Sequence, residues 1–332
     1  MSNIKVNAVL DASGGTTATV NGYTPTASNM AGRNRIINGA MVIDQRNAGA
    51  SVTPTDGTYT LDRWIYKASQ ASKVSIQQNA GSVTPPAGYT KYLGCTSLSA
   101  YTVGAAERFD VEQRIEGLNT ADLAWGTASA SAITLSFWVR SSLTGTFGGS
   151  ITNSASNRSY PFTYTISVTN TWEQKSITVA GDTSGTWLTT NGIGLIAIFS
   201  LGAGSTYSGT AGAWAGTFYG SATGATSVVG TSGATFYITG VQLEAGSTAT
   251  DFEYRLYGTE LALCQRYYQK TITNWVIESG GTFQTKYHQV TMRTTPTTTG
   301  GGSGYVYAGD GNVLSESQTA RAYQQLTYSA EL

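Results

Sequence analysis

Bulky apolar residues alternate with small or polar residues along most of this chain. The clearest case is the segment Ala132–Ser141, in which Ile133, Leu135, Phe137 and Val139 are separated by single residues. A period of two places such residues on one side of an extended segment, as in a strand that buries one face. The pattern therefore predicts a half-buried β-strand.

The same alternation recurs in short segments that are separated by loops rich in Gly, Ser, Thr and Asn. Strands of this length with turn-rich connections are typical of sandwiches and jelly rolls, and no βαβ alternation is visible. We expect an all-β jelly roll or β-sandwich over residues 33–257. The segments predicted as strands are 34–44, 59–66, 73–78, 89–97, 108–115, 132–141, 160–168, 172–180, 192–201, 215–219 and 234–244.

One short helix is predicted after the sandwich. Leu261 and Leu263 lie among good helix formers behind Thr259 and Glu260, so the helix is expected within 259–270. Residues 258–332 are expected to form this helix and a smaller β-rich block. The further strands are predicted at 274–278, 282–293, 304–308 and 323–329, with a glycine tract at 300–302.

Residues 1–32 contain few large apolar side chains, which predicts an extended N-terminal arm with little core of its own. Two interpretations stay open: a tail without fixed structure, or an attachment segment that becomes ordered on a partner. The first residues lack the apolar stretch of a signal peptide, and no run approaches 18 apolar residues. We therefore expect synthesis in a cytoplasm and no membrane insertion.

Charged residues make up 11% of the chain, against about 25% in ordinary soluble domains. The 19 basic and 19 acidic residues cancel. Thr, Ser, Gly, Asn and Gln replace the missing charge, which is typical of secreted and virion β-proteins. Because phosphate contacts dominate nucleic-acid affinity, a chain without a basic field is not expected to bind nucleic acid.

The residues for catalysis or metal binding are sparse. His288 is the one histidine, and Cys95 and Cys264 lie far apart in the sequence. We expect no catalytic triad, no metal site and no cofactor. Cys264 is expected to be a small buried apolar residue within the helix, and a disulfide between the cysteines stays open.

One carboxylate pair could suit a glycan-cleaving enzyme. Asp110 and Glu112 are two residues apart in a predicted strand, so their side chains lie on the same face. Glycosidases require such a pair of carboxylates. Arg108 and Arg114 are an even number of residues away from both carboxylates, so they are expected on the same strand face. We therefore favour a polar face on which the arginines pair with the carboxylates. We therefore expect a protein that is not an enzyme. No Asp-rich loop of recognisable spacing exists, and whether Asp and backbone oxygens bind Ca²⁺ stays open.

Aromatic residues in polar loops carry the binding hypothesis. Sugar rings stack their C–H faces on Trp and Tyr, and loops on a rigid sandwich commonly carry binding residues. The alternative is that these side chains pack under the loops or across a subunit interface. The glycan-binding candidates are Trp187, Tyr207, Trp214 and Tyr219, all in or beside glycine- and serine-rich loops.

Four segments and the last residues carry a family resemblance. The segments are Asn38-Gly-Ala-Met41 running on to Asp44-Gln-Arg46, Tyr59-Thr-Leu-Asp-Arg-Trp64, Gly240-Val-Gln-Leu-Glu244 leading to Asp251-Phe-Glu-Tyr254, and Leu261-Ala-Leu-Cys-Gln-Arg-Tyr-Tyr268, and the ending is Ser329-Ala-Glu-Leu332. Together they span roughly residues 33–332 and resemble tail-fibre-like proteins of bacteriophages and prophages, including those of marine and cyanobacterial hosts. Separately, the strand patterns at 135–140, 172–174 and 236–244 resemble the core strands of jelly-roll carbohydrate-binding modules.

The resemblance implies a homotrimeric fibre subunit of the virion tail. Residues 1–32 would join it to other virion proteins, and its distal loops would contact a host-surface glycan or lipopolysaccharide. The alternative is a head fibre, capsid decoration or tail adaptor protein with an assembly role alone.

Overall fold

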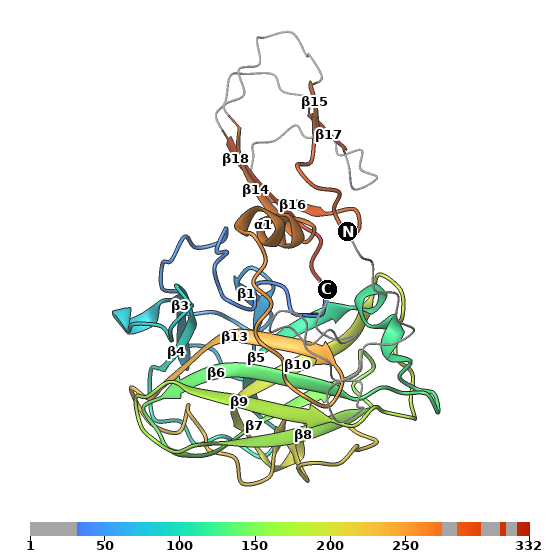
Figure 1. Ribbon diagram of the computed structural model, residues 1–332. Helices are drawn as coiled ribbons and strands as arrows, with labels where there is room; N and C mark the ends of the chain where they lie inside the picture. Colours follow the sequence, from blue (N-terminus) through green and yellow to red (C-terminus); the bar gives the residue numbers. More distant parts are fainter. Residues whose placement is uncertain (1–31, 274–283, 300–312, 317–323) are drawn as a thin grey trace, which may run out of the picture.

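Two antiparallel sheets face each other and form the body of the protein (Figure 1). This computed structural model describes residues 32–273, 284–299, 313–316 and 324–332. The first sheet has the order β1 (Thr58–Leu61), β2 (Trp64–Ala68), β5 (Arg108–Glu116), β10 (Ile193–Ala203), β7 (Gly145–Thr152) and β8 (Ser159–Ile166). The second has the order β3 (Val74–Gln78), β4 (Leu93–Ser97), β13 (Thr235–Ala245), β6 (Ile133–Ser141) and β9 (Glu173–Val179). The expected all-β sandwich of jelly-roll type, with one short helix, is confirmed.

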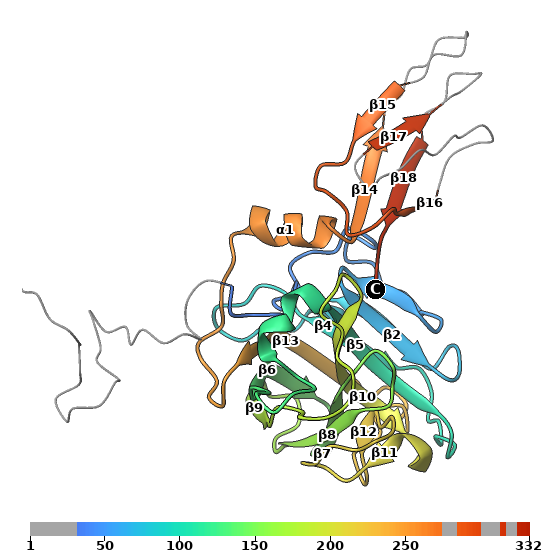
Figure 2. The same ribbon diagram turned by 90° about the vertical axis from the view of Figure 1, so that its right-hand side faces the viewer.

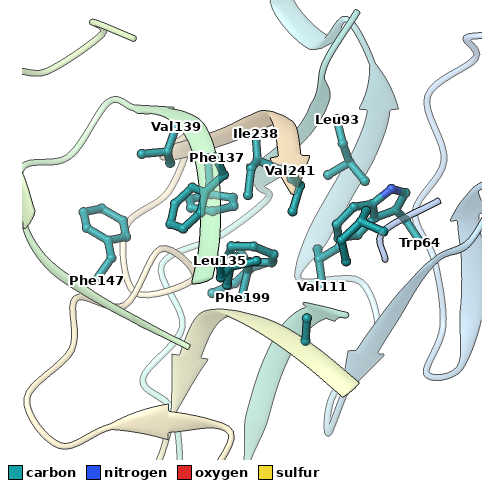
Figure 3. Close-up of a cluster of buried hydrophobic side chains, with 14 of the residues drawn as sticks. Trp64, Leu93, Val111, Leu135, Phe137, Val139, Phe147, Phe199, Ile238 and Val241 are labelled. Atoms are coloured by element: carbon teal, nitrogen blue, oxygen red, sulfur yellow. The ribbon is translucent and has the colours of Figure 1, made fainter. Parts of the chain in front are cut away.

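The core lies between the two sheets. The apolar face predicted for 132–141 is buried as expected, and Phe137 of β6 meets Phe199 of β10 with ring centres 5.1 Å apart. Figure 3 shows these rings together with Trp64 and Val111 from the first sheet. Burying each such side chain stabilises the fold by roughly 1.5–3 kcal/mol.

The segment 34–44 is not the strand that its alternation predicts. Asn38 and Met41 adopt left-handed backbone angles, with φ of 59° and 58°. The buried amide of Asn38 accepts a hydrogen bond from the N–H of Ile43 and donates to the carbonyls of Ile43 and Asp62. A side chain thus replaces strand pairing as the partner of this backbone, which an apolar pattern does not reveal.

Two other strand predictions need correction. The segment 59–66 is a hairpin, because the chain turns at Asp62 and Arg63, where φ is 71°. The segment 215–219 forms only an isolated bridge between Ser159 and Ala215.

Strand β7 was not predicted, because glycine is a poor strand former. Its glycines are nevertheless required by close packing. A Cβ at Gly149 would lie 2.3 Å from the carbonyl oxygen of Ile198 on β10.

Short elements complete the sandwich. The parallel pair β11 (Ser208–Gly209) and β12 (Ser221–Ala222) lies against the first sheet beside β7. The 3-10 turns are η1 (Ala80–Ser82), η2 (Gly117–Asn119), η3 (Ala121–Leu123) and η4 (Ser205–Tyr207).

The helix α1 (Tyr257–Gln265) ends earlier than predicted, since the chain enters strand β14 (Tyr268–Thr273). There β14 pairs with β18 (Gln324–Ser329), which also pairs with β16 (Thr297–Thr299). A second pair joins β15 (Gln284–Tyr287) to β17 (Val313–Glu316), and these strands project from the sandwich (Figure 2).

Several sequence predictions lie outside the described residues. They are the arm up to residue 31 and the strands at 274–278 and 304–308, and 282–293 is described only from residue 284. None of the helices in the described ranges is long and apolar enough to cross a membrane.

A buried ion pair connects the C-terminal segment to the sandwich. Glu331 accepts hydrogen bonds from Arg63 and, at 2.6 Å, from Arg46. The Arg63 side chain is 1% exposed and lies over the ring of Tyr267, 3.6 Å from its centre. Arg114 donates to the carbonyl of Leu332 at 2.7 Å. We call Arg46, Arg63 and Glu331 the junction triad.

We predict that Glu331→Ala lowers the free energy of unfolding by about 3–5 kcal/mol, because it leaves the buried Arg63 charge without its carboxylate. Urea unfolding would measure the loss. The control is Asp122→Ala, which removes an exposed partner of Arg35 and should cost at most about 1 kcal/mol. Equal effects of the two substitutions would contradict a structural role for the triad.

Candidate functional site

Two of the four aromatic candidates pack on each other, and the other two pack elsewhere. Trp187, in the loop between β9 and β10, and Trp214, between β11 and β12, have ring centres 5.5 Å apart. Tyr207 packs its ring on Phe218, and Tyr219 lies against Gly209, where a Cβ would be 2.3 Å from the tyrosine ring. The sequence therefore named two tryptophans that the fold does bring together.

A third tryptophan packs against both Trp187 and Trp214. Trp125, which is 7% exposed, meets Trp187 at 4.6 Å and Trp214 at 5.4 Å, both edge to face. Tyr160 of β8 adds a fourth ring, 5.2 Å from Trp214. We call Trp125, Tyr160, Trp187 and Trp214 the tryptophan cluster. Edge-to-face pairs of this kind are worth about 0.5–1.5 kcal/mol each beyond their buried area.

Hydrogen bonds fix the three indoles. The N–H of Trp214 donates to the carbonyl of Ala180 at 2.9 Å, and that of Trp125 to Ser131 at 2.6 Å. Trp187 donates to the Asp182 carboxylate at 3.2 Å. With these N–H groups occupied inside the protein, the cluster can offer a ligand its ring surfaces.

The buried Asp182 carboxylate holds side chains of the cluster and its surroundings in place. Its carboxylate accepts two hydrogen bonds from Arg158, at 2.7 and 2.6 Å. The guanidinium of Arg158 in turn lies 5.7 Å from the ring centre of Trp214. This pairing with Asp182 raises the pKa of Arg158, so its charge is retained.

An open groove borders the cluster on its Tyr160 side. It has a volume of about 270 Å³ and lies between β8 and β9, the strands that end the two sheets. Figure 1 shows these strands next to each other at the lower side of the sandwich. The groove is lined by Tyr160, Phe162, Thr163, Ile177, Thr178, Ala211 and Gly212.

A second hollow beside the cluster offers little room. It is lined by Trp125 and Trp187, among others, and holds about 10 Å³, close to the space of one water molecule. The groove beside Tyr160 is much larger than this hollow.

Sequence reasoning missed Trp125 and Tyr160. Tyr160 lies in the predicted strand 160–168 and is not among the loop candidates, but its position on the last strand of the sheet leaves it half-buried beside the groove. Trp125 precedes Gly126 in a stretch without a predicted strand, and this loop position was the available signal.

Asp110 and Glu112 form the salt-linked polar face that was predicted from their even spacing to Arg108 and Arg114. Arg114 Nε lies 3.0 Å from Glu112, and Arg108 lies 3.5 Å from Asp110 and 3.9 Å from Glu112. Both carboxylates are at most 2% exposed. Burial, together with the neighbouring Glu112, raises the pKa of Asp110 to about 7, although Arg108 opposes the shift.

The remaining reactive residues do not gather into a site. Cys95 and Cys264 are both free and buried, so the disulfide that the sequence leaves open is not formed. Burial raises the pKa of each thiol. His288 follows β15 and packs edge-on against Tyr328 at 4.7 Å. Within the described ranges, no group of three His, Cys, Asp or Glu side chains could hold a metal ion.

Comparison with known proteins gives remote structural likenesses. No protein-family model matches the chain, and no curated protein matches it. The enzymatically active domain of tailspike protein 4 from Bacteriophage CBA120 is 11% identical, with a TM-score of 0.32. That match covers 58% of this chain and 21% of the tailspike chain, so this chain spans about a fifth of the tailspike length.

Two further solved structures are sugar-binding by their descriptions. One is from Bacteroides thetaiotaomicron, with 11% identity, a TM-score of 0.39, and coverage of 64% of this chain and 100% of that chain. The other is a family 11 carbohydrate-binding module from Clostridium thermocellum, in complex with a mixed-linked tetrasaccharide. It has 13% identity, a TM-score of 0.30, and coverage of 60% and 96%. At these values the likeness does not extend to the chemistry of a site.

We predict that Asp110→Asn flattens the pH dependence of stability between about pH 4 and pH 7. The folded-state pKa lies above the unfolded value of about 3.9, so the stabilisation is complete below pH 4 and is lost as the pH rises through 7. At about 1.4 kcal/mol per pKa unit, the loss is on the order of 4 kcal/mol. Parallel unfolding profiles for the wild type and the variant would contradict this.

Proposed function

We propose that this protein is a non-enzymatic glycan-binding structural protein. The groove between β8 and β9 would take the glycan, with the tryptophan cluster as its rigid aromatic wall. Affinity would come from stacking of sugar rings on Trp214 and Tyr160. The hydroxyls of Thr163 and Thr178 line the same groove. That of Thr163 would donate and accept hydrogen bonds, whereas that of Thr178, which donates to the carbonyl of Ser247 at 3.1 Å, would accept them.

One observation carries this proposal: the aromatic rings beside the groove are fixed before any ligand arrives. Trp214 is held by its indole hydrogen bond, by two edge-to-face ring contacts with other tryptophans and by the Tyr160 ring. A preorganised surface binds with less loss of conformational entropy than a flexible loop does. The groove is also open along the sandwich, which suits a polymer better than a small enclosed metabolite.

The arrangement of the carboxylates supports a binding role over glycan cleavage. A retaining or inverting glycosidase needs two carboxyl groups that face the sugar from either side of the scissile bond. Asp110 and Glu112 instead lie on one strand face, buried and paired with arginines. They lie apart from the residues that line the groove.

The place of the protein is part of the same proposal. We propose a tail-fibre-type receptor-binding subunit of a phage virion, assembled as a homotrimer and attached to other virion proteins through residues 1–32. The sequence resemblance and the charge-poor, hydroxyl-rich composition support it. Several weak sites on one particle would reach useful avidity, because linked binding events act at a high effective concentration.

We predict that Trp214→Ala weakens binding to host-surface polysaccharide or lipopolysaccharide by roughly tenfold or more, as truncation of a central aromatic contact costs about 1–2 kcal/mol or more. Glycan microarrays and titration calorimetry on purified protein would measure it. The matched control is Trp172→Ala, since Trp172 is also half-buried but packs on Tyr92, outside the tryptophan cluster that borders the groove.

Equal losses in the two variants would mean that the groove is not the binding site. No binding by the wild type, together with antibody labelling of the capsid rather than the tail, would favour the assembly role as a head fibre, decoration or adaptor protein.

A further inference from the structure

A second group of aromatic rings lies at the other end of the sandwich. Tyr89, Phe252 and Tyr254 surround one point, with ring centres 5.4, 5.6 and 5.0 Å apart. Within the described residues, the apolar core clusters do not include these rings. Tyr254 is 60% exposed and so gives up much of the burial that usually holds an aromatic side chain in place.

Two glycines position the tyrosine rings. A Cβ at Gly240, where φ is 60°, would lie 2.5 Å from the Tyr89 hydroxyl, and a Cβ at Gly88 would lie 2.8 Å from the Tyr254 hydroxyl. The Tyr254 hydroxyl also donates to the carbonyl of Gly88 at 3.0 Å. The exposed ring is therefore held in one place by backbone contacts, which an incidental surface tyrosine would not need.

A cleft of about 220 Å³ opens beside these rings. It is smaller than the roughly 300–1,000 Å³ of pockets for drug-sized ligands, so it suits a ligand of about one ring. The three aromatic residues form one wall, and Gly39, Ala40, Val42 and Asn34 of the irregular N-terminal segment form another.

The polar groups of the cleft are balanced in charge. Arg255 and Glu260 both line it and lie 3.4 Å apart, and Arg255 also donates to the carbonyl of Ile36 at 3.0 Å. Glu260 accepts the N–H of Asn38 and keeps unused lone pairs. Thr90 adds an exposed hydroxyl. A paired cation and anion favour a neutral ligand with many hydroxyls over a phosphate or a carboxylate.

We infer that this cleft is a second glycan site, which binds a single neutral sugar residue against the ring of Tyr254. The three-ring wall would take the apolar face of the sugar, and Thr90, Arg255 and Glu260 would bond its hydroxyls. The inference rests on the proposed function, because both sites would bind the same class of ligand. The cleft includes Glu260 of α1 and the groove includes residues of β8. Since α1 and β8 lie on opposite sides of the sandwich (Figures 1 and 2), one chain could hold two separate sugars.

The test uses the full chain and methyl glycosides of glucose, galactose, mannose and N-acetylglucosamine as probes, followed by saturation-transfer NMR. In Trp214→Ala, transfer to at least one glycoside should persist. In the double variant Trp214→Ala/Tyr254→Ala it should fall at least fivefold. The matched control is Tyr257→Ala in the same background, because Tyr257 is 64% exposed, lies three residues away and does not line the cleft.

The outcomes separate the two sites. Loss of all transfer in Trp214→Ala alone would overturn the second site and leave the groove standing, whereas loss in Tyr254→Ala alone would support the cleft and remove the groove. No transfer to any probe in the wild type would overturn both. A change of molar mass by light scattering in Tyr254→Ala and Tyr257→Ala would instead identify a subunit interface, and the cleft proposal would fail.

Discussion

The buried pair of Arg63 and Glu331 is the interaction that joins the two parts of this protein. Arg63 lies in the turn between β1 and β2, and Glu331 is the last residue but one of the chain. A guanidinium that is 1% exposed cannot be left without a partner, since an unpaired buried charge costs several kcal/mol. The pair therefore binds the end of the chain to the first sheet and sets where the C-terminal strands project.

Three of the four segments that resemble tail-fibre-like proteins meet near this junction. Gln45 donates to the Asp62 carboxylate at 2.6 Å, and the Trp64 indole donates to the Asn38 carbonyl at 3.1 Å. From the helical segment, the Tyr267 hydroxyl donates to Glu116 at 2.7 Å. Residues of three of the four segments thus serve to hold elements together, and these contacts explain their presence without a ligand. The remaining segment supplies Tyr254 to the cleft beside α1.

The sequence predicts the fold class well because a two-residue period survives in most buried strands. The prediction is wrong where side-chain hydrogen bonds, close packing or strand pairing determines the backbone conformation. Buried side-chain amides, those of Asn38 and Gln113 in particular, hold 34–44 as a buried loop. In β7 the glycines pack too closely for any side chain, so the residue type that argues against a strand is the one that the strand requires. The helix ends early because pairing with β18 outweighs helix propensity from Tyr268 on.

The candidate site was predictable only in part. Loop position pointed to Trp187 and Trp214, and the fold brings these two tryptophans together. Residues such as Trp125 and Tyr160 join them from distant segments, and no spacing in the chain encodes that meeting. The even spacing of the arginines around Asp110 predicted their ion pairs with the carboxylates, since side chains on one face of a strand stay neighbours in any sandwich.

The internal hydrogen bonds of the three indoles have an evolutionary consequence. Since the ring N–H groups are committed to the scaffold, the tryptophans would contribute adhesion without discriminating between stereoisomers. Discrimination would then depend on small, replaceable side chains on the neighbouring strand edges, such as Thr163 and Thr178. Under the proposed function, a lineage could change the glycan that it prefers by exchanging those few positions while the aromatic framework stayed the same.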